Sequence, residues 1–270
     1  MSMFKEYYGF TKNPFDKQSL TEKDAFQSKD HKAMISCLSY LHKLRGFGVF
    51  TSAPGFGKTY AARCFTKSLD RNLNEVAYLS MSTVSVADFY RQFCGALGID
   101  APFGKAAMFR AVQERLFYLF KEKKKPLFLV LDEAQKLSTH ILGDLKLIMN
   151  HDFDSINCFS IVLCGETYLN ANLEKQPHEA LRQRIVISYN FEGLSNEETE
   201  AYLIHKLQIA GAPPSILGEG TLAAITAYAG GCPRLLDNLM TKAFMLGAQL
   251  DKKALDADVV MAAVNGLSLS

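Results

Sequence analysis

The fold is decided by Val49-Phe50-Thr51-Ser52-Ala53-Pro54-Gly55-Phe56-Gly57-Lys58-Thr59, where an apolar run enters a turn with two glycines and leaves it on a lysine. Gly55 and Gly57 permit main-chain angles that turn successive N–H groups inward. A helix is predicted from Lys58 to Leu69, and the positive end of its dipole would point at the same turn. The stretch therefore predicts an anion-binding turn between a strand and a helix.

The turn matches the phosphate-loop pattern G-x-x-x-x-G-K-T, except that Ser52 stands in place of its first glycine. Ser52 lies at the strand exit and away from the N–H groups, so we expect phosphate binding to survive this exchange. Lys58 can reach the β and γ phosphates of a nucleotide, and the Thr59 hydroxyl can hold Mg²⁺. A plain strand-to-helix turn is the alternative interpretation. The predicted nucleotide-binding residues here are Pro54, Gly55, Phe56, Gly57, Lys58, Thr59 and Tyr60.

A second chemical signal is the uninterrupted apolar run from Leu127 to Leu131, which ends on Asp132 and Glu133 and is typical of a strand buried on both faces. Two carboxylates at such a strand end are costly when they are desolvated without partners. A Mg²⁺-nucleotide would be that partner, with Asp132 holding the metal through water and Glu133 deprotonating the attacking water. An Asp-Glu pair after a strand is common, so this prediction depends on the phosphate loop before it.

Along the chain, short apolar runs alternate with longer amphipathic stretches, which predicts an α/β fold with a parallel sheet covered by helices. Strands are predicted at 49–53, 76–81, 127–131, 159–164 and 185–191. Helices between them are predicted at 58–69, 86–97, 109–123 and 139–149, and from Ser195 onward only helices are predicted, at 196–210, 217–228, 233–249 and 257–264. The expected organisation is an N-terminal linker and helix at 1–45, a nucleotide-binding domain at 46–194, and a small helical domain at 195–270.

Composition excludes several classes of protein. The chain has 270 residues, 48% of them apolar, with 30 basic against 28 acidic side chains, which is unlike a disordered or collagenous chain. No apolar run exceeds the six residues Val259 to Val264, and Met1 to Tyr8 lack a signal sequence, so we expect no membrane span and a cytoplasmic location. The six cysteines form no C-x-x-C pair, and we interpret them as small apolar residues rather than metal ligands.

Charge is divided unevenly between the two halves of the chain. Positions 1–125 hold 20 lysines and arginines against 11 acidic residues, whereas positions 126–270 hold 10 against 17. Such a division marks a region that faces a polyanion, or two faces that attract each other in an assembly. The alternative is that the basic excess is spread over solvated helices.

The order of four segments resembles AAA+ ATPases: Ser52 to Thr59, Leu127 to Glu133, Leu181-Arg182-Gln183-Arg184-Ile185, and Gly230-Gly231-Cys232-Pro233-Arg234. More narrowly, the chain resembles the branch that holds ExeA-type ATPases and the transposition regulators TnsC and MuB. The resemblance implies an AAA+ three-layer α/β/α sheet followed by a small all-helical lid domain. It also implies ATP as the nucleotide, with Mg²⁺.

Two further segments narrow the branch. The opening from Tyr7 through Asn13-Pro14-Phe15 is similar to the start of that branch. The segment His178 to Arg184 looks like ATPases encoded beside transposases in bacterial insertion elements. The likeness extends over nearly the whole chain, from Tyr7 to Leu267.

The resemblance assigns three arginines to the nucleotide. It implies that Arg184, with Arg182 as the second candidate, is an arginine finger for the nucleotide of a neighbouring subunit, where a guanidinium stabilises charge on the γ-phosphate. It implies that Arg234 reaches the phosphates from the small domain. Surface arginines without these roles are the alternative in each case.

One position departs from the family pattern. The strand at 159–164 should deliver an uncharged polar residue near the γ-phosphate, but Glu166 follows it. A carboxylate there would repel phosphate, so we expect Thr167 or a rotated Glu166 to serve, and slow hydrolysis. Phe15, with Pro14, is predicted beside adenine as the family's N-terminal linker is, with a core anchor as the alternative.

Contacts with DNA would go to phosphates and carry no sequence preference. The candidates are Ser82 to Ser85 with Arg91, and Lys105 with Arg110. The basic run Lys121 to Lys125 is interpreted as a solvated helix end, and as a nucleic-acid patch only in second place.

The predicted function is an ATP-dependent DNA-binding regulator of transposition that assembles head to tail, as a ring or filament, on double-stranded DNA and recruits a transposase. An ExeA-like ATPase that acts through protein partners in envelope or secretion assembly is the alternative. A third hypothesis is a scaffold that binds ATP and barely hydrolyses it.

Overall fold

A computed structural model describes residues 3–16, 21–82, 85–149 and 157–267. The chain divides into two compact units. We call Ala33–Pro54 with Lys58–Phe191 the α/β unit, and Met1–Lys32 with Gly55–Gly57 and Glu192–Ser270 the helical unit. The three consecutive ranges expected from the sequence remain a prediction.

The α/β unit is built on a sheet of five parallel strands within the described residues, in the order β2-β3-β4-β1-β5. The predicted parallel α/β fold is confirmed. All six residues of β1, β3 and β4 are buried, as their near-continuous apolar runs predict for strands covered on both faces. The strands are β1 (Gly46–Thr51), β2 (Glu75–Ser80), β3 (Leu127–Asp132), β4 (Ser160–Gly165) and β5 (Ile185–Asn190).

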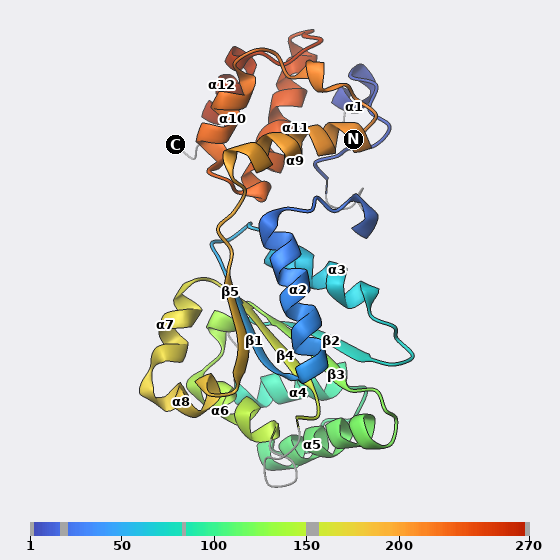
Figure 1. The fold of residues 1–270 in the computed structure, drawn as a ribbon, viewed down its shortest axis with the longest axis vertical. Coiled ribbons are helices and arrows are strands. Elements are labelled where there is room, and N and C mark those ends of the chain that lie inside the picture. Colours follow the sequence, from blue (N-terminus) through green and yellow to red (C-terminus); the bar gives the residue numbers. More distant parts are fainter. Residues whose placement is uncertain (1–2, 17–20, 83–84, 150–156, 268–270) are drawn as a thin grey trace. The chain divides into compact units, whose positions relative to one another are not determined.

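Helices cover both faces of this sheet, which gives three layers (Figure 1). On one face, Phe65 packs against Phe128 with ring centroids 5.1 Å apart, and Leu41 packs against Gly48. On the other face, Phe89 and other buried residues of the helices form one apolar core with the strands. The first face carries α2 (Lys29–Leu44) and α3 (Lys58–Ser68), and the second carries α4 (Val86–Ala96), α5 (Lys105–Lys121) and α6 (Thr139–Ile148).

Parallel pairing brings the carboxyl ends of the central strands to one edge of the sheet. Thr51 at the end of β1 pairs with Gly165 at the end of β4, and Ser80 at the end of β2 pairs with Asp132 at the end of β3. The residues that follow these strands are therefore neighbours. The amino end of β5 lies at the opposite edge, where Ile185 pairs with Phe47.

The helical unit is organised around Phe244, which contacts aromatic rings from the N-terminal segment. The rings of Phe4, Phe10 and Phe15 have centroids 6.1, 5.1 and 5.8 Å from that of Phe244. The N-terminal segment therefore packs with the C-terminal helices, a long-range contact that no local pattern predicted. The helices are α1 (Met3–Tyr7), α9 (Asn196–Ile209), α10 (Thr221–Ala229), α11 (Pro233–Gln249) and α12 (Ala257–Asn265).

The remaining differences from the predicted elements are local. Two short helices, α7 (Tyr168–Glu174) and α8 (Glu179–Arg182), were not predicted, and α5 begins four residues earlier than expected. In the helical unit the described residues contain one isolated bridge, Leu217 with Leu255, and otherwise only helices and loops, as predicted. The six cysteines all lie in the described residues, where none is joined in a disulfide, and four of them are buried.

Candidate functional site

The glycines of the turn after β1 have the backbone conformation that the phosphate-loop pattern requires. Gly55 and Gly57 have φ of 90° and 99°, a region that residues with a Cβ rarely adopt. No atom lies within 4 Å of the position a Cβ would take at Gly57, so the loop is open there. Helix α3 begins at the next residue, Lys58. The N–H groups of the first helical turn are therefore adjacent to the loop.

Lys58 is a buried cation, with 9% of its surface exposed. Its Nζ donates to the hydroxyl and carbonyl of Ser52 and to the carbonyl of Ala53, which are all neutral oxygens. Burial lowers the pKa of Lys58, and nearby acidic groups including Asp132 act in the opposite direction. A buried ammonium whose described partners are neutral oxygens fits an anionic ligand such as a phosphate.

Ser52 contacts Lys58, although the sequence suggested that it lies apart from the phosphate-binding groups. Its side chain is fully buried, and its hydroxyl donates to the carbonyl of Ala53 at 2.6 Å while accepting from Lys58. A glycine at this position would leave Lys58 with main-chain partners alone. Serine in place of the usual glycine therefore gives Lys58 a side-chain hydrogen-bond acceptor.

Asp132 at the end of β3 accepts hydrogen bonds from three directions. Its Oδ2 accepts from the Thr59 hydroxyl and the Tyr78 hydroxyl, both at 2.8 Å, and its Oδ1 accepts from the Glu133 N–H at 3.0 Å. Burial and the hydrogen bond to Asp132 raise the pKa of Tyr78. The carboxylate and the Thr59 hydroxyl form a pair of hard oxygen ligands, the type that Mg²⁺ prefers. Tyr78 was not predicted, because its position on β2 becomes informative only once β2 is known to pair with β3.

Glu133 leaves the strand in a left-handed conformation, with φ 56° and ψ 35°. This conformation is uncommon for a residue other than glycine. Its carboxylate is 44% exposed, accepts from Gln135 Nε2 at 3.0 Å, and lies 3.5 Å from Lys136 Nζ. The carboxylate is thus accessible to water and is held by two neighbouring side chains.

Glu166, at the exit of β4, is connected to this group through Gln135. The N–H of Glu166 donates to Gln135 Oε1 at 3.1 Å, and Gln135 Nε2 lies 3.4 Å from Glu166 Oε1. Thr167 is exposed at the start of α7. The structure therefore brings Glu166 together with Glu133, and Gln135 is a site residue that the sequence interpretation missed. A polar residue two positions after the Asp-Glu pair was the available signal.

The two predicted finger arginines cap the ends of helices within their own chain. Arg184 Nη1 donates to the carbonyl of Lys146 at 3.1 Å, near the end of α6. Arg182 Nη1 donates to the carbonyls of Leu173 and Lys175, at the end of α7. Cations at helix C-termini are stabilised by the dipole and by the free carbonyls.

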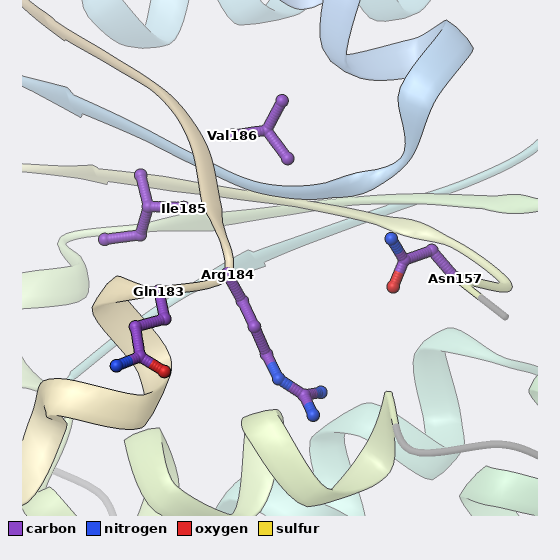
Figure 2. Close-up of a pocket in the computed structure, with 5 residues that line it drawn as sticks. All are labelled: Asn157, Gln183, Arg184, Ile185 and Val186. Carbon is purple, nitrogen blue, oxygen red and sulfur yellow. The ribbon is translucent and has the colours of Figure 1, made fainter. Parts of the chain in front are cut away.

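Arg184 also lines a hollow of about 330 Å³, and its side chain extends toward the helix below it (Figure 2). The hollow lies at the amino edge of the sheet, where Ile185 of β5 pairs with Phe47, and Phe47 stands four positions before Thr51, the end of β1. At ~3.3 Å per residue, the two edges are ~13 Å apart along the strands. Arg184 thus lies at the opposite edge of the sheet from Ser52, which follows the end of β1. The other lining residues are Asn157, Gln183, Ile185 and Val186.

In the helical unit, Arg234 is an exposed residue in the first turn of α11. Its N–H donates to the carbonyl of Gly55 at 3.4 Å. A Cβ at Gly55 would lie 2.9 Å from both Arg234 Cβ and Cys232 Sγ, so glycine is required there by close approach as well as by its positive φ. The main chain of the loop and the start of α11 are therefore in contact within this unit.

Phe15, which was predicted beside adenine, is instead a core residue of the helical unit. Only 5% of its surface is exposed, and its ring stacks against that of Phe244. Lys206 Nζ lies 6.0 Å from the centre of the Phe15 ring. The role the structure gives this side chain is the core anchor, which was the alternative interpretation.

Two of the four residues predicted to contact DNA form ion pairs with acidic residues. Arg91 forms an ion pair with Asp88, and Lys105 Nζ lies 2.8 Å from the mostly buried carboxylate of Asp144. Ser82 and Arg110 are exposed, and positions 83 and 84 lie outside the described residues. The structure does not bring these four residues into one cluster by any contact among the described side chains.

The basic run after α5 has a different environment. Lys121 Nζ lies 5.9 Å from the ring centre of Phe117, and Lys123 Nζ lies 5.6 Å from that of Tyr118. Within the described ranges, neither lysine forms an ion pair. This end of α5 therefore presents cations over partly exposed aromatic rings.

The α/β unit is similar to domains of known proteins. Residues 41–173 match a family model described as AAA domain. This segment is similar to AAA domains. General secretion pathway protein A of Aeromonas hydrophila is 28% identical over 265 residues, which cover 97% of this chain, and the chain spans 48% of that protein's length. These findings support an AAA+ ATPase.

Solved structures agree on the AAA+ fold. CDC6P from Pyrobaculum aerophilum has a TM-score of 0.74 at 15% identity, covering 95% of this chain and 72% of that one. Aeropyrum pernix ORC1, solved in complex with DNA, has a TM-score of 0.71 at 16% identity. The match covers 96% of this chain and 70% of that one. The Thermotoga maritima RuvB branch migration motor has a TM-score of 0.60 at 16% identity. The match covers 90% of this chain and 70% of that one. In the residues that the structure describes, no helix has both the length and the apolar character to cross a membrane.

Proposed function

We propose that this chain binds and slowly hydrolyses ATP, with the phosphates held by the loop from Gly55 to Lys58. The supporting observation is Lys58, a buried ammonium that donates to neutral oxygens beside the Thr59 and Asp132 pair. A phosphate oxygen would satisfy the charge of Lys58. Thr59 and Asp132 would hold Mg²⁺, which when bound stabilises negative charge at the phosphates.

Glu133 would orient the attacking water and accept its proton as general base. Its carboxylate is half exposed, and its main chain has a left-handed conformation. Glu166 brings a second negative charge to the same place, which supports slow turnover, and Thr167 remains the alternative polar residue for the γ-phosphate. Arg234 would contact the phosphates from the helical unit.

We further propose that Arg184 acts on the nucleotide of a neighbouring copy, with Arg182 as the second candidate. The location of Arg184 at the amino edge of the sheet supports this, because the phosphate loop of the same chain lies at the carboxyl edge. A guanidinium there can complete only a site that another copy presents. The consequence is head-to-tail assembly into a ring or filament.

Mixing two inactive variants tests the shared site. Arg184→Ala lacks the finger and Glu133→Gln lacks the base, so each alone should lose at least ~100-fold in turnover. In a mixture, the Glu133→Gln copy still supplies Arg184 to a neighbour with an intact Glu133. ATPase activity should therefore reappear on mixing. If the mixture stays as inactive as its components, Arg184 does not act on the nucleotide of a neighbouring copy. If wild type and Glu133→Gln turn over ATP equally, Glu133 is not the base for hydrolysis.

The proposed client is double-stranded DNA, on which the assembly would recruit a transposase and regulate transposition. Support comes from the excess of basic residues at positions 1–125 and from the likeness of the segment His178 to Arg184 to transposon-associated ATPases. ORC1, which has the same fold, was solved in complex with DNA. The candidate contacts are Ser82, Arg91, Lys105 and Arg110. With ATP, the purified protein should be retained on DNA of arbitrary sequence at ~50 mM salt and released as salt rises.

A second candidate client is a protein partner in secretion. General secretion pathway protein A matches 97% of this chain, and that observation favours work through protein contacts. The two candidates are separated by DNA retention and by the neighbouring genes. A secretion gene beside this one, with no ATP-dependent DNA retention, would favour the second candidate.

A further inference from the structure

Gln135 lies between the two carboxylates at the exits of β3 and β4. It is 6% exposed, and its Nε2 is 3.0 Å from Glu133 Oε2 and 3.4 Å from Glu166 Oε1. A primary amide has two N–H donors, and each ionised carboxylate can only accept. One nitrogen therefore serves both carboxylates.

The orientation of this amide is fixed by a main-chain group. The N–H of Glu166 donates to Gln135 Oε1 at 3.1 Å, and a main-chain N–H cannot accept. The atom facing it must be the oxygen, so the nitrogen must face the carboxylates. A flipped amide would direct its oxygen at two carboxylates and leave the N–H of Glu166 without an acceptor.

Gly165, at the end of β4, leaves space for the Gln135 side chain because it has no Cβ. A Cβ at Gly165 would lie 2.8 Å from Gln135 Oε1 and 2.9 Å from Leu169 Cδ2. Neither the amide oxygen nor the core leucine could move aside without breaking a contact. The close approach of Gln135 to the end of β4 is therefore built into the backbone.

We propose that Gln135 is a positioning residue for ATP hydrolysis, whose amide orients the Glu133 carboxylate toward the attacking water and holds the Glu166 carboxylate aside. This inference rests on the proposed ATPase function. Two ionised carboxylates repel each other, and a shared neutral donor keeps both in place without adding charge. Gln135 also explains how Glu166 is kept at a position where a free carboxylate would face phosphate. Because its described partners are these two glutamates, its loss should change turnover rather than ATP affinity.

Two substitutions remove the donors in different ways. Gln135→Glu keeps the size of the side chain and the acceptor for Glu166 N–H, but replaces the N–H donors with a third carboxylate. Gln135→Asn keeps the amide but is one methylene too short to reach both partners. Gln135→Asn should lower kcat about 10- to 100-fold and leave the KM for ATP within ~2-fold, because misorientation of the base by ~1 Å has effects of that size. Gln135→Glu should lower kcat at least as much and also raise the KM for ATP, because its added carboxylate repels phosphate. The exposed Gln208→Glu is the matched charge control and should keep wild-type kcat.

A double-mutant cycle tests whether Gln135 acts through Glu133. In the Glu133→Gln background, Gln135→Glu should cause no further loss of the residual rate. An equal loss in both backgrounds, or a kcat within twofold of wild type for both Gln135 variants, would overturn the inference alone. If the wild-type chain binds ATP but does not hydrolyse it, the proposed ATPase function is wrong, and the inference about Gln135 fails with it. Melting temperatures of the variants, compared with wild type, separate lost folding from lost positioning.

Discussion

The Thr59 hydroxyl donates to Oδ2 of Asp132 at 2.8 Å, which connects the first turn of α3 to the end of β3. The two residues are far apart in sequence and meet because β1 and β3 end at the same edge of the sheet. Both oxygens are ligands of the kind that Mg²⁺ takes, and their contact means that the ligand pair is organised before any ion binds.

Thr59→Val removes the hydroxyl while keeping the shape of the side chain, so it should weaken Mg²⁺-dependent ATP binding about tenfold or more. Thr59→Ser keeps the hydroxyl and should bind within about threefold of wild type. Calorimetric titration of ATP with Mg²⁺ and with a chelator measures both. If Thr59→Val loses no more affinity in Mg²⁺ than in chelator, Thr59 is not a metal ligand.

Lys58→Met should separate ligand binding from stability. Affinity for ATP should fall at least ~100-fold, because the charge-assisted bonds to phosphate are lost. The free protein should melt at the same temperature or higher, since burial lowers the pKa of Lys58 and a buried apolar side chain avoids that desolvation. Fluorescence-monitored melting and ATP titration test the two parts. A large drop in melting temperature would mean that Lys58 holds the loop together instead of serving its ligand.

Ser52→Gly restores the usual phosphate-loop residue, and we expect it to raise ATP affinity by about fivefold. In the free protein the Ser52 hydroxyl accepts a hydrogen bond from Lys58 that a phosphate would have to replace. Removing this competitor strengthens binding by a fraction of the ~1.5–3 kcal/mol of a hydrogen bond to a charged group. Ser160→Gly, at the start of β4, is the matched control for the loss of a buried serine whose hydroxyl donates to a main-chain carbonyl. Unchanged or weaker ATP binding by Ser52→Gly would show that Ser52 supports the lysine in the bound state as well.

The sheet and the phosphate loop could be predicted because their signals are local. Leu127–Leu131 is uninterruptedly apolar since both faces of β3 are covered, and α11 was predicted with its observed bounds, since Pro233 marks its start. Gly55 and Gly57 reveal the loop through conformations that other residues avoid. Each of these features depends on a residue and its neighbours in the chain.

The site and core residues that the sequence did not reveal depend on which strands and helices are neighbours in the fold. Gln135 and Tyr78 are ordinary polar residues until β2, β3 and β4 pair and bring their ends together. Phe15 was assigned to adenine on resemblance, whereas it packs against Phe244, more than two hundred positions later in the chain. The short helices α7 and α8 carry too few turns for an apolar period to be recognised.

The buried pair Lys206 and Asp237 should stabilise the helical unit strongly against the loss of one partner. Lys206 Nζ lies 3.3 Å from Asp237 Oδ1 and donates to the carbonyl of Pro14 at 2.8 Å. Lys206→Met should lower the free energy of unfolding by ~3 kcal/mol, because it leaves a buried carboxylate without its cation. Lys206→Met combined with Asp237→Leu should recover part of that loss. Urea unfolding measures both, and a double variant less stable than the single one would contradict an ion-pair origin.

Asp24 gives the N-terminal segment a pH-dependent contribution to stability. The main-chain N–H of Thr21 and then the Lys12 ammonium lower the pKa of Asp24 from 3.8 to about 2. A carboxyl with a lowered pKa binds fewer protons when folded than when unfolded, so its stabilising effect is complete above the ordinary value of 3.8 and is lost as pH falls through about 2. Asp24→Asn should therefore melt a few degrees below wild type at pH 6. The gap should narrow steadily below pH ~4.

The matched control for Asp24→Asn is Glu6→Gln, which alters an exposed carboxylate of the same N-terminal segment. Both variants remove one negative charge, so general charge effects should shift their melting temperatures alike, whereas only Asp24→Asn removes the acceptor of the Thr21 N–H and the partner of Lys12. Melting curves at pH 6, 3.5 and 2.5 compare the plateau above 3.8 with two points between the two pKa values. A gap between Asp24→Asn and wild type that stays constant across this series would assign the effect to packing, because only a titrating carboxylate loses its advantage as protons bind.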